Sequence, residues 1–158
     1  MSEVNLGGWE NVKFGEVDVP KDGYADIPDG EYTFQLLPFA KYRQSEFDGK
    51  TFVSTNATAQ IAEGDSRGRR VFFEFPDPAA TNKEGKPKTW SAQMLKKLSI
   101  VVGIDIEEGE GPVAYLNRAA NTGNARFVAK LGTRVIIKQD GTENKRQEVN
   151  LFSFKPAA

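Results

Sequence analysis

The fold of this chain is decided by residues 91–102, which read SAQMLKKLSIVV. Ser91 is the expected N-cap of a helix here, and Gly103 stands where a left-handed C-terminal residue belongs. Five apolar residues recur at the spacing of one helical face: Met94, Leu95, Leu98, Val101 and Val102. The stretch therefore predicts one amphipathic helix in the middle of the chain.

Strand-like runs flank this helix on both sides. Three precede it, at residues 31–42, 51–62 and 70–75, and three follow it, at residues 126–131, 133–139 and 147–154. Turn residues separate them, and Pro38 indicates a bulge or an edge position in the first run. Pro112 favours the start of a short second helix over 112–116.

A single helix between the third and fourth strands of a small antiparallel β-structure is typical of the OB barrel. We therefore expect a mainly β protein: a five-stranded OB-type barrel with an extra strand, one amphipathic helix between strands three and four, and a short second helix. Barrels of this kind usually bind long, thin, charged ligands.

Composition places the chain among soluble globular proteins. With 158 residues and 39% hydrophobic content, it is large enough for one domain with its own core. It has no apolar run near the roughly 18 residues of a membrane span, and residues 1–9 lack the basic region of a signal peptide. We expect a cytoplasmic protein with no membrane partner.

The chain contains neither cysteine nor histidine. Disulfides, thiolate metal sites, cysteine nucleophiles and the commonest general base are therefore excluded. Carboxylates with a hard metal, or a lysine, would remain for catalysis, but no motif of either kind stands out. The expectation is a protein that is not an enzyme, with no catalytic residue, no metal and no cofactor.

Charge is distributed unevenly along the chain. Up to Glu31, eight acidic residues stand against two lysines, a net charge of −6, so the remainder carries +5 of the total of −1. We expect residues 1–27 to form an acidic, partly ordered leader, and residues 28–158 to form the body. The leader is either a solvated tail or a segment that competes with a polyanion for the basic body. Its apolar residues favour packing over the body: Trp9, Phe14, Val17, Val19 and Tyr24.

The first predicted hairpin combines cations with aromatic rings. Lys41, Tyr42 and Arg43 precede the turn Asp48-Gly49, while Phe47 and Lys50 flank it. Single-strand binders need this mixture, since cations contact phosphates and flat rings stack on bases. The alternative is an ordinary solvated hairpin tip with one or two rings in the core.

Four further cations are expected on one side of two adjacent strands. Arg126 and Lys130 share one face of the first, and Arg134 and Lys138 repeat the alternation in the second. This stripe is either a polyanion track or the ordinary polar side of an antiparallel sheet. Residues from the neighbouring turn and loop could extend such a track: Arg67, Arg69, Arg70, Lys86, Lys88 and Trp90. For Trp90 the alternative is a lid on the core.

Five short stretches stand in an order and spacing that resemble a known family. They are PDGEY at 28–32, GRRVF at 68–72, VGI at 102–104, RFVAK at 126–130, and EVN at 148–150 continuing to FKP at 154–156. In this they resemble the small phage-encoded single-stranded DNA-binding proteins with an OB fold. The resemblance covers residues 28–156.

The resemblance implies a protein that binds single-stranded DNA without sequence specificity in phage DNA replication or recombination. Its location would then be the host cell cytoplasm. A homo-oligomer and contacts with phage replication or recombination proteins stay open. The alternative function is that of a β-rich phage virion or assembly protein with no nucleic-acid role.

Overall fold

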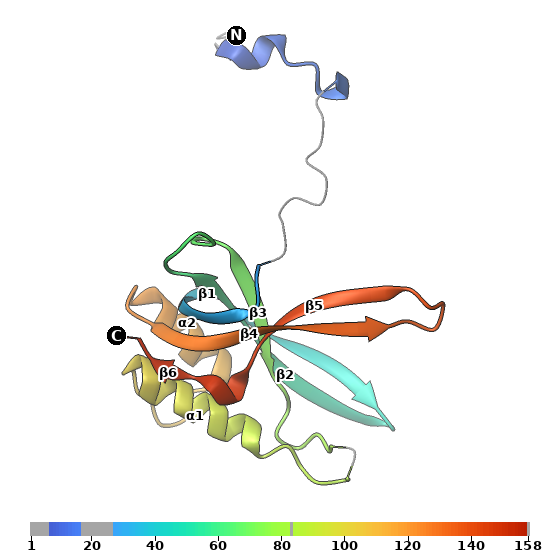
Figure 1. The fold of residues 1–158 in the computed structure, drawn as a ribbon. Coiled ribbons are helices and arrows are strands. Elements are labelled where there is room, and N and C mark those ends of the chain that lie inside the picture. Colours follow the sequence, from blue (N-terminus) through green and yellow to red (C-terminus); the bar gives the residue numbers. More distant parts are fainter. Residues whose placement is uncertain (1–6, 17–26, 83, 158) are drawn as a thin grey trace, which may run out of the picture.

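A computed structural model describes residues 7–16, 27–82 and 84–157 of the chain (Figure 1). The described elements are the 3-10 helices η1 (Gly7–Asn11), η2 (Phe14–Glu16) and η3 (Leu151–Ser153), the α-helices α1 (Trp90–Val102) and α2 (Pro112–Asn121), and the strands β1 (Gly30–Phe47), β2 (Lys50–Ile61), β3 (Arg70–Phe75), β4 (Arg126–Ile137), β5 (Glu143–Val149) and β6 (Lys155–Pro156).

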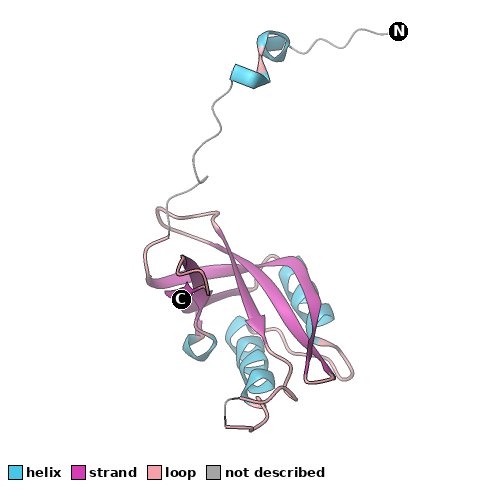
Figure 2. Ribbon diagram, turned by 90° about the vertical axis from the view of Figure 1, so that its right-hand side faces the viewer, coloured by secondary structure: helices cyan, strands magenta, loops and turns pink. Residues whose placement is uncertain are grey.

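The strands form one antiparallel sheet in the order β3-β2-β1-β4-β5, and β6 adds to β4. β1 is its central strand. Its first residues pair with β4, and most of its length pairs with β2. Figure 2 shows the strands curling around one another with the α-helices beside them. The chain is thus mainly β, as predicted.

The predicted barrel is not closed in the described part of the chain. β3 and β5, the two ends of the strand order, share no ladder of hydrogen bonds there. A hollow of about 740 Å³ touches both strands, with Phe72 and Glu74 from β3 and Arg146 and Glu148 from β5 on its walls. A hollow, rather than backbone pairing, therefore lies between the two ends of the sheet.

The prediction of separate strands over 126–131 and 133–139 is wrong. β4 runs without a break through Gly132, because the strand changes partners there instead of turning. It pairs with β1 as far as Leu131 and with β5 from Leu131 onward. The turn comes later, at Asp140 and Gly141, where Gly141 adopts a φ of 83°. β4 and β5 therefore form a long hairpin arm (Figure 1).

The prediction of one strand over 147–154 is also wrong, because β5 begins earlier, at Glu143, and does not continue to residue 154. β5 ends at Val149, and the chain then turns through η3 before β6. The Asn150 side chain caps η3 by accepting a hydrogen bond from the backbone N–H of Phe152 at 2.9 Å. Such a cap competes with extended pairing, which explains the interruption.

The central helix forms where the sequence predicts it, but it begins at Trp90. Ser91 is not its N-cap: the cap position is Thr89, which makes no side-chain capping bond, and Ser91 is buried in the first turn. Gly103 ends the helix in the left-handed conformation, as expected, with a φ of 74°. α2 begins at Pro112 as predicted and continues beyond the expected residue 116 to Asn121.

A cluster of buried rings fills the inner side of the sheet. Phe34 on β1 stacks on Phe127 of β4 with 5.5 Å between ring centroids. Phe73 of β3 and Phe154 complete the cluster through edge contacts with Phe127. The opposite side of β1, β2 and β3 carries polar and charged residues together with the exposed rings of Phe39 and Phe72.

The segment between the two helices is fastened by α2. Arg118 donates two hydrogen bonds of 2.8 Å to the Glu110 carboxylate and one of 2.6 Å to the Asp105 carbonyl. The fully buried Tyr115 donates its hydroxyl hydrogen to the Ile104 carbonyl at 2.6 Å. These contacts fix residues 103–111 against the body.

In the leader, the described residues are 7–16. Trp9 and Phe14 stack on each other, with 6.1 Å between ring centroids, and both side chains are exposed. These two rings do not belong to the hydrophobic core. The other apolar leader residues, Val17, Val19 and Tyr24, lie outside the described residues.

Candidate nucleic-acid interface

The outer face of β1, β2 and β3 carries alternate residues of each strand. The pairing register places Lys41 of β1 opposite Asn56 of β2, and Asn56 opposite Glu74 of β3. Thr58 lies opposite Phe72 in the next row of the same face. Because side chains alternate across a strand, the intervening residues enter the core.

Two hollows adjoin on this face and form one continuous depression, which we call the groove. The larger has a volume of about 740 Å³ and the smaller about 260 Å³. They share four lining residues: Phe72, Phe73, Glu74 and Arg146. The groove thus extends from the outer face of β1 and β2, across β3, to β4, β5 and the start of α1.

Cations predominate in the groove. Two carboxylates, Glu74 and Glu148, lie on its walls. Each forms only a loose, solvent-accessible ion pair, at 3.9 Å from Arg43 and 3.8 Å from Arg134 respectively. Seven cations line it: Lys41, Arg43, Arg70, Lys88, Lys130, Arg134 and Arg146. The groove therefore has a clear excess of positive charge, which attracts anions.

Arg134 and Arg146 concentrate this charge at the base of the hairpin arm. They are directly opposite each other on β4 and β5. Like charges in this position destabilise a sheet. Arg134 has Glu148 as a partner, whereas Arg146 has no ion-pair partner among the described residues. An anion bound between the two guanidinium groups would relieve their repulsion.

Aromatic rings are exposed along the same groove. Phe72 is 63% exposed, and it has no ring or cation partner in the described part of the chain. The Phe39 ring is covered by the Arg70 guanidinium at 5.0 Å. At the other end, Trp90 packs on the exposed Phe152 with 5.1 Å between centroids. Phe72 is thus the most accessible flat surface in the groove.

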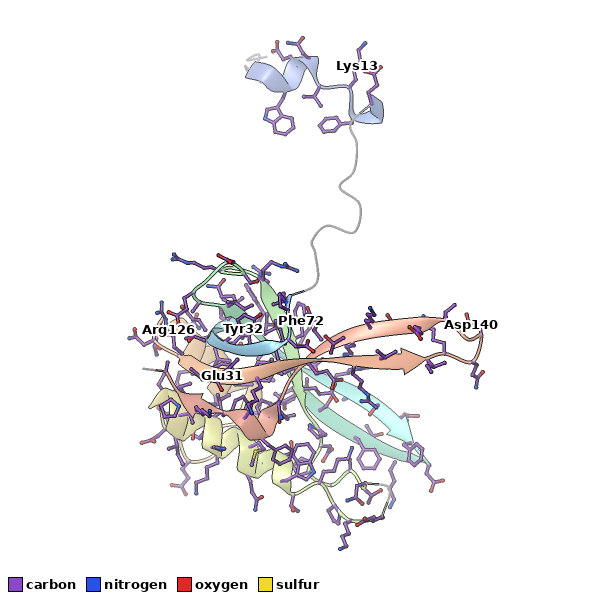
Figure 3. The ribbon with its side chains drawn as sticks, viewed as in Figure 1. Lys13, Glu31, Tyr32, Phe72, Arg126 and Asp140 are labelled. Carbon is purple, nitrogen blue, oxygen red and sulfur yellow. The ribbon has the colours of Figure 1, made fainter. Side chains whose placement is uncertain are left out.

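Seven residues predicted from the sequence lie in the groove: Lys41, Arg43, Arg70, Lys88, Trp90, Lys130 and Arg134. The predicted stripe of four cations does not span two neighbouring strands, because Arg126, Lys130 and Arg134 all lie on β4. Arg126 is at the far end of β4 from the arm tip at Asp140 (Figure 3). Lys138 follows the end of β4, close to that tip.

The remaining predicted residues lie outside the groove. Tyr42 is on the other face of β1 from Lys41 and Arg43, and its hydroxyl oxygen accepts a hydrogen bond of 3.4 Å from the Val113 N–H of α2. Phe47 and Lys50 flank the β1–β2 turn at the tip of that hairpin. Arg67 and Arg69 lie in the β2–β3 turn, and Lys86 in the loop before α1.

Sequence reasoning missed several groove residues. The signal for Phe72 was present, because Val71, Phe73 and Phe75 share one parity of β3 and Phe72 has the other. For the others no local signal exists, since β1, β3, β5 and η3 come together only in the fold. Among the missed residues are Phe39, Asn56, Thr58, Phe72, Glu74, Arg146, Glu148 and Phe152.

The described residues contain no group of three or more acidic side chains that could hold a metal ion. None of their helices is long and apolar enough to cross a membrane. Comparison of the chain with protein-family models, curated proteins and solved structures finds no match. The groove itself is therefore the basis for a functional interpretation.

Proposed function

We propose that this chain is a non-enzymatic protein that binds single-stranded DNA in the groove with little sequence preference. The observation that carries the proposal is the combination of seven cations with the exposed ring of Phe72 in one continuous depression. Cations along a groove neutralise phosphates of any sequence, and an exposed ring stacks on any unpaired base.

The proposal includes an OB-type fold, which the strand order and the position of α1 support. It also includes the resemblance to phage-encoded single-stranded DNA-binding proteins, with a role in phage DNA replication or recombination in the host cytoplasm. Base stacking favours a single strand over a duplex, because the bases of a duplex are stacked on each other and their faces are covered.

A fluorescence titration of the full chain with oligonucleotides of increasing length tests the proposal. We expect the affinity to rise with length until the groove is filled, and to exceed the affinity for duplexes of the same length. Failure to bind single strands at low salt would exclude the proposal. Equal affinity for single strands and duplexes would show that the groove binds polyanions in general and does not select single strands.

A virion or assembly role is the second candidate. One observation favours it: Val135, Ile136 and Ile137 are exposed in succession near the tip of the hairpin arm. Exposed apolar residues of this kind mark contacts with other proteins. They lie away from the groove, however, so this role would leave the cations and Phe72 without a purpose. Nucleic-acid binding explains both the groove cations and the exposed ring of Phe72, which an assembly role does not.

A further inference from the structure

The floor of the smaller hollow contains a polar atom without a partner. The side-chain oxygen Oδ1 of Asn56 is buried and accepts no hydrogen bond from any described residue. Leaving a buried acceptor unpaired costs free energy, so native structures rarely retain one without a reason. A ligand that donates an N–H at this point would remove the cost.

The neighbours of Asn56 do not supply that donor. Lys41 and Glu74 are opposite it on β1 and β3. The Glu74 carboxylate is itself an acceptor and lies 3.9 Å from Arg43. Lys41 makes no hydrogen bond to Asn56 in the described part of the chain. Asn56 lines the smaller hollow, but its Oδ1 is covered, so a donor reaches this acceptor only when the side chains over it shift aside.

The ring of Phe72 is within reach of the same point. Thr58 is directly opposite Phe72, and Asn56 is two residues from Thr58 on the same face of β2. Diagonal neighbours of this kind are about 7–8 Å apart, a separation that an aromatic side chain can span. A flat group stacked on Phe72 would therefore extend its edge over Asn56.

We propose that Phe72 and Asn56 form a base-binding subsite, in which an unpaired nucleobase stacks on Phe72 and donates an N–H to Oδ1 of Asn56. This inference rests on the proposed function, and it names the contacts by which the groove would hold one base of the single strand. Adenine and cytosine carry an amino donor, and guanine and thymine a ring N–H, so every base can occupy the subsite. In a duplex these donors are used in base pairing, so the subsite selects single strands.

Two oligonucleotides of equal length isolate this hydrogen bond. One carries adenine and the other carries unsubstituted purine, which has the same ring system but no amino group. We expect the wild-type chain to bind the adenine oligonucleotide about fivefold more tightly or better, since a buried acceptor then regains its partner. Asn56→Leu should bind both equally, with the wild-type affinity for the purine oligonucleotide.

Gln60→Leu is the matched control, because Gln60 lies on the same face of β2 but outside both hollows. It should keep the wild-type preference for adenine. The melting temperature of Asn56→Leu should equal or exceed that of the wild type, because the substitution removes an unpaired buried acceptor. If the leucine variant does not fold, Asn56→Ala replaces it in the same comparison.

The outcomes separate the subsite from the proposed function. If the wild type binds both oligonucleotides equally, or if Asn56→Leu keeps the adenine preference, the subsite is refuted and single-strand binding still stands. If the wild type binds neither oligonucleotide at low salt, the proposed function itself fails.

Discussion

Phe72 differs from the other two phenylalanines of β3 in the direction of its side chain. Phe73 and Phe75 are buried and contact each other with 5.7 Å between ring centroids. Phe72 has the opposite parity and stays 63% exposed on the groove side of the strand. An exposed ring contributes little to folding, so its presence among cations is better explained by a ligand.

Replacing Phe72 with alanine should weaken single-strand binding about fivefold or more. Stacking is worth about 1–3 kcal/mol per base, and about 1.4 kcal/mol corresponds to a tenfold change in affinity. The melting temperature should change little because the ring is exposed. Phe47→Ala is the control, since Phe47 is 73% exposed at the hairpin tip outside the groove. Equal losses of affinity in both variants would contradict the assignment of Phe72.

The Glu110 carboxyl has a strongly lowered pKa. The two hydrogen bonds from Arg118, followed by that from the Glu107 backbone, lower the pKa of Glu110 from 4.5 to about 2. Its side chain is only 10% exposed. Burial of Tyr115 nearby raises the pKa of its hydroxyl to about 12. Both groups therefore keep one charge state throughout the neutral range.

The stability supplied by Glu110 should depend on pH in a defined window. Because its folded pKa is lower than its unfolded pKa, the contribution is complete above about pH 4.5 and disappears as the pH falls through about 2. Glu110→Gln should lower the melting temperature at pH 7, and the difference from the wild type should shrink between pH 4.5 and 2. Glu108→Gln, an exposed neighbour, should show no such effect. A difference that is constant down to pH 2 would contradict this account.

At the scale of elements, the bulge in β1 depends on α2. The β1–β2 register shifts between Leu37 and Lys41, after Pro38, which leaves backbone groups of the bulge without strand partners. The Asn117 side chain of α2 replaces those partners. It accepts from the Ala40 N–H at 2.9 Å and donates to the Ala40 carbonyl at 3.3 Å. The bulge adds two residues to β1 and so keeps the parity of the strand, which leaves Lys41 and Arg43 on the same outer face as Leu37, where they line the groove.

Asn117→Ala should reduce the free energy of unfolding by about 1–3 kcal/mol, the usual cost of leaving buried polar groups unpaired. Urea denaturation measures this difference. Asn121→Ala provides the control, because it makes the same exchange at an exposed position of the same helix. Similar stabilities of the two variants would show that water replaces the Asn117 amide without cost.

At the scale of the whole molecule, the net charge of −1 conceals the character of the groove. The acidic residues up to Glu31 offset the basic body in the sum, while the seven groove cations gather from β1, β3, β4, β5 and the loop before α1. Association with a polyanion should therefore be governed by the local charge of the groove rather than by the total.

Single-strand affinity should decrease strongly with salt. For single strands, the logarithm of the binding constant falls with the logarithm of salt concentration by about 0.7 per neutralised phosphate. Arg146→Gln should weaken binding and reduce this slope by about 0.7, because it removes one contact. Lys50→Gln, at the hairpin tip, should leave the slope unchanged. An affinity that does not depend on salt would rule out the electrostatic part of the proposal.

The sequence by itself determined the local elements of this protein. The periodicity of residues 91–102, the glycine at 103 and the parity of β2 and β3 act within a few residues, so they predicted α1 and the early strands closely. Prediction from the sequence failed where pairing between distant strands overrode the local signals. Gly132 resembles a turn residue, yet β4 passes through it because β1 and β5 offer partners on either side.

Only the tertiary structure decided the composition of the groove. The sequence placed Tyr42 between two cations, but strand pleating puts it on the opposite face, against α2. Phe72, Asn56 and Arg146 come from three different strands, and no pattern within one strand shows that they line the same hollow. Alternation along a strand decides which of its residues share a face. The register between strands, the bulge and the coiling of the sheet decide which strand faces lie side by side. Those three depend on contacts between distant residues, which no local pattern encodes.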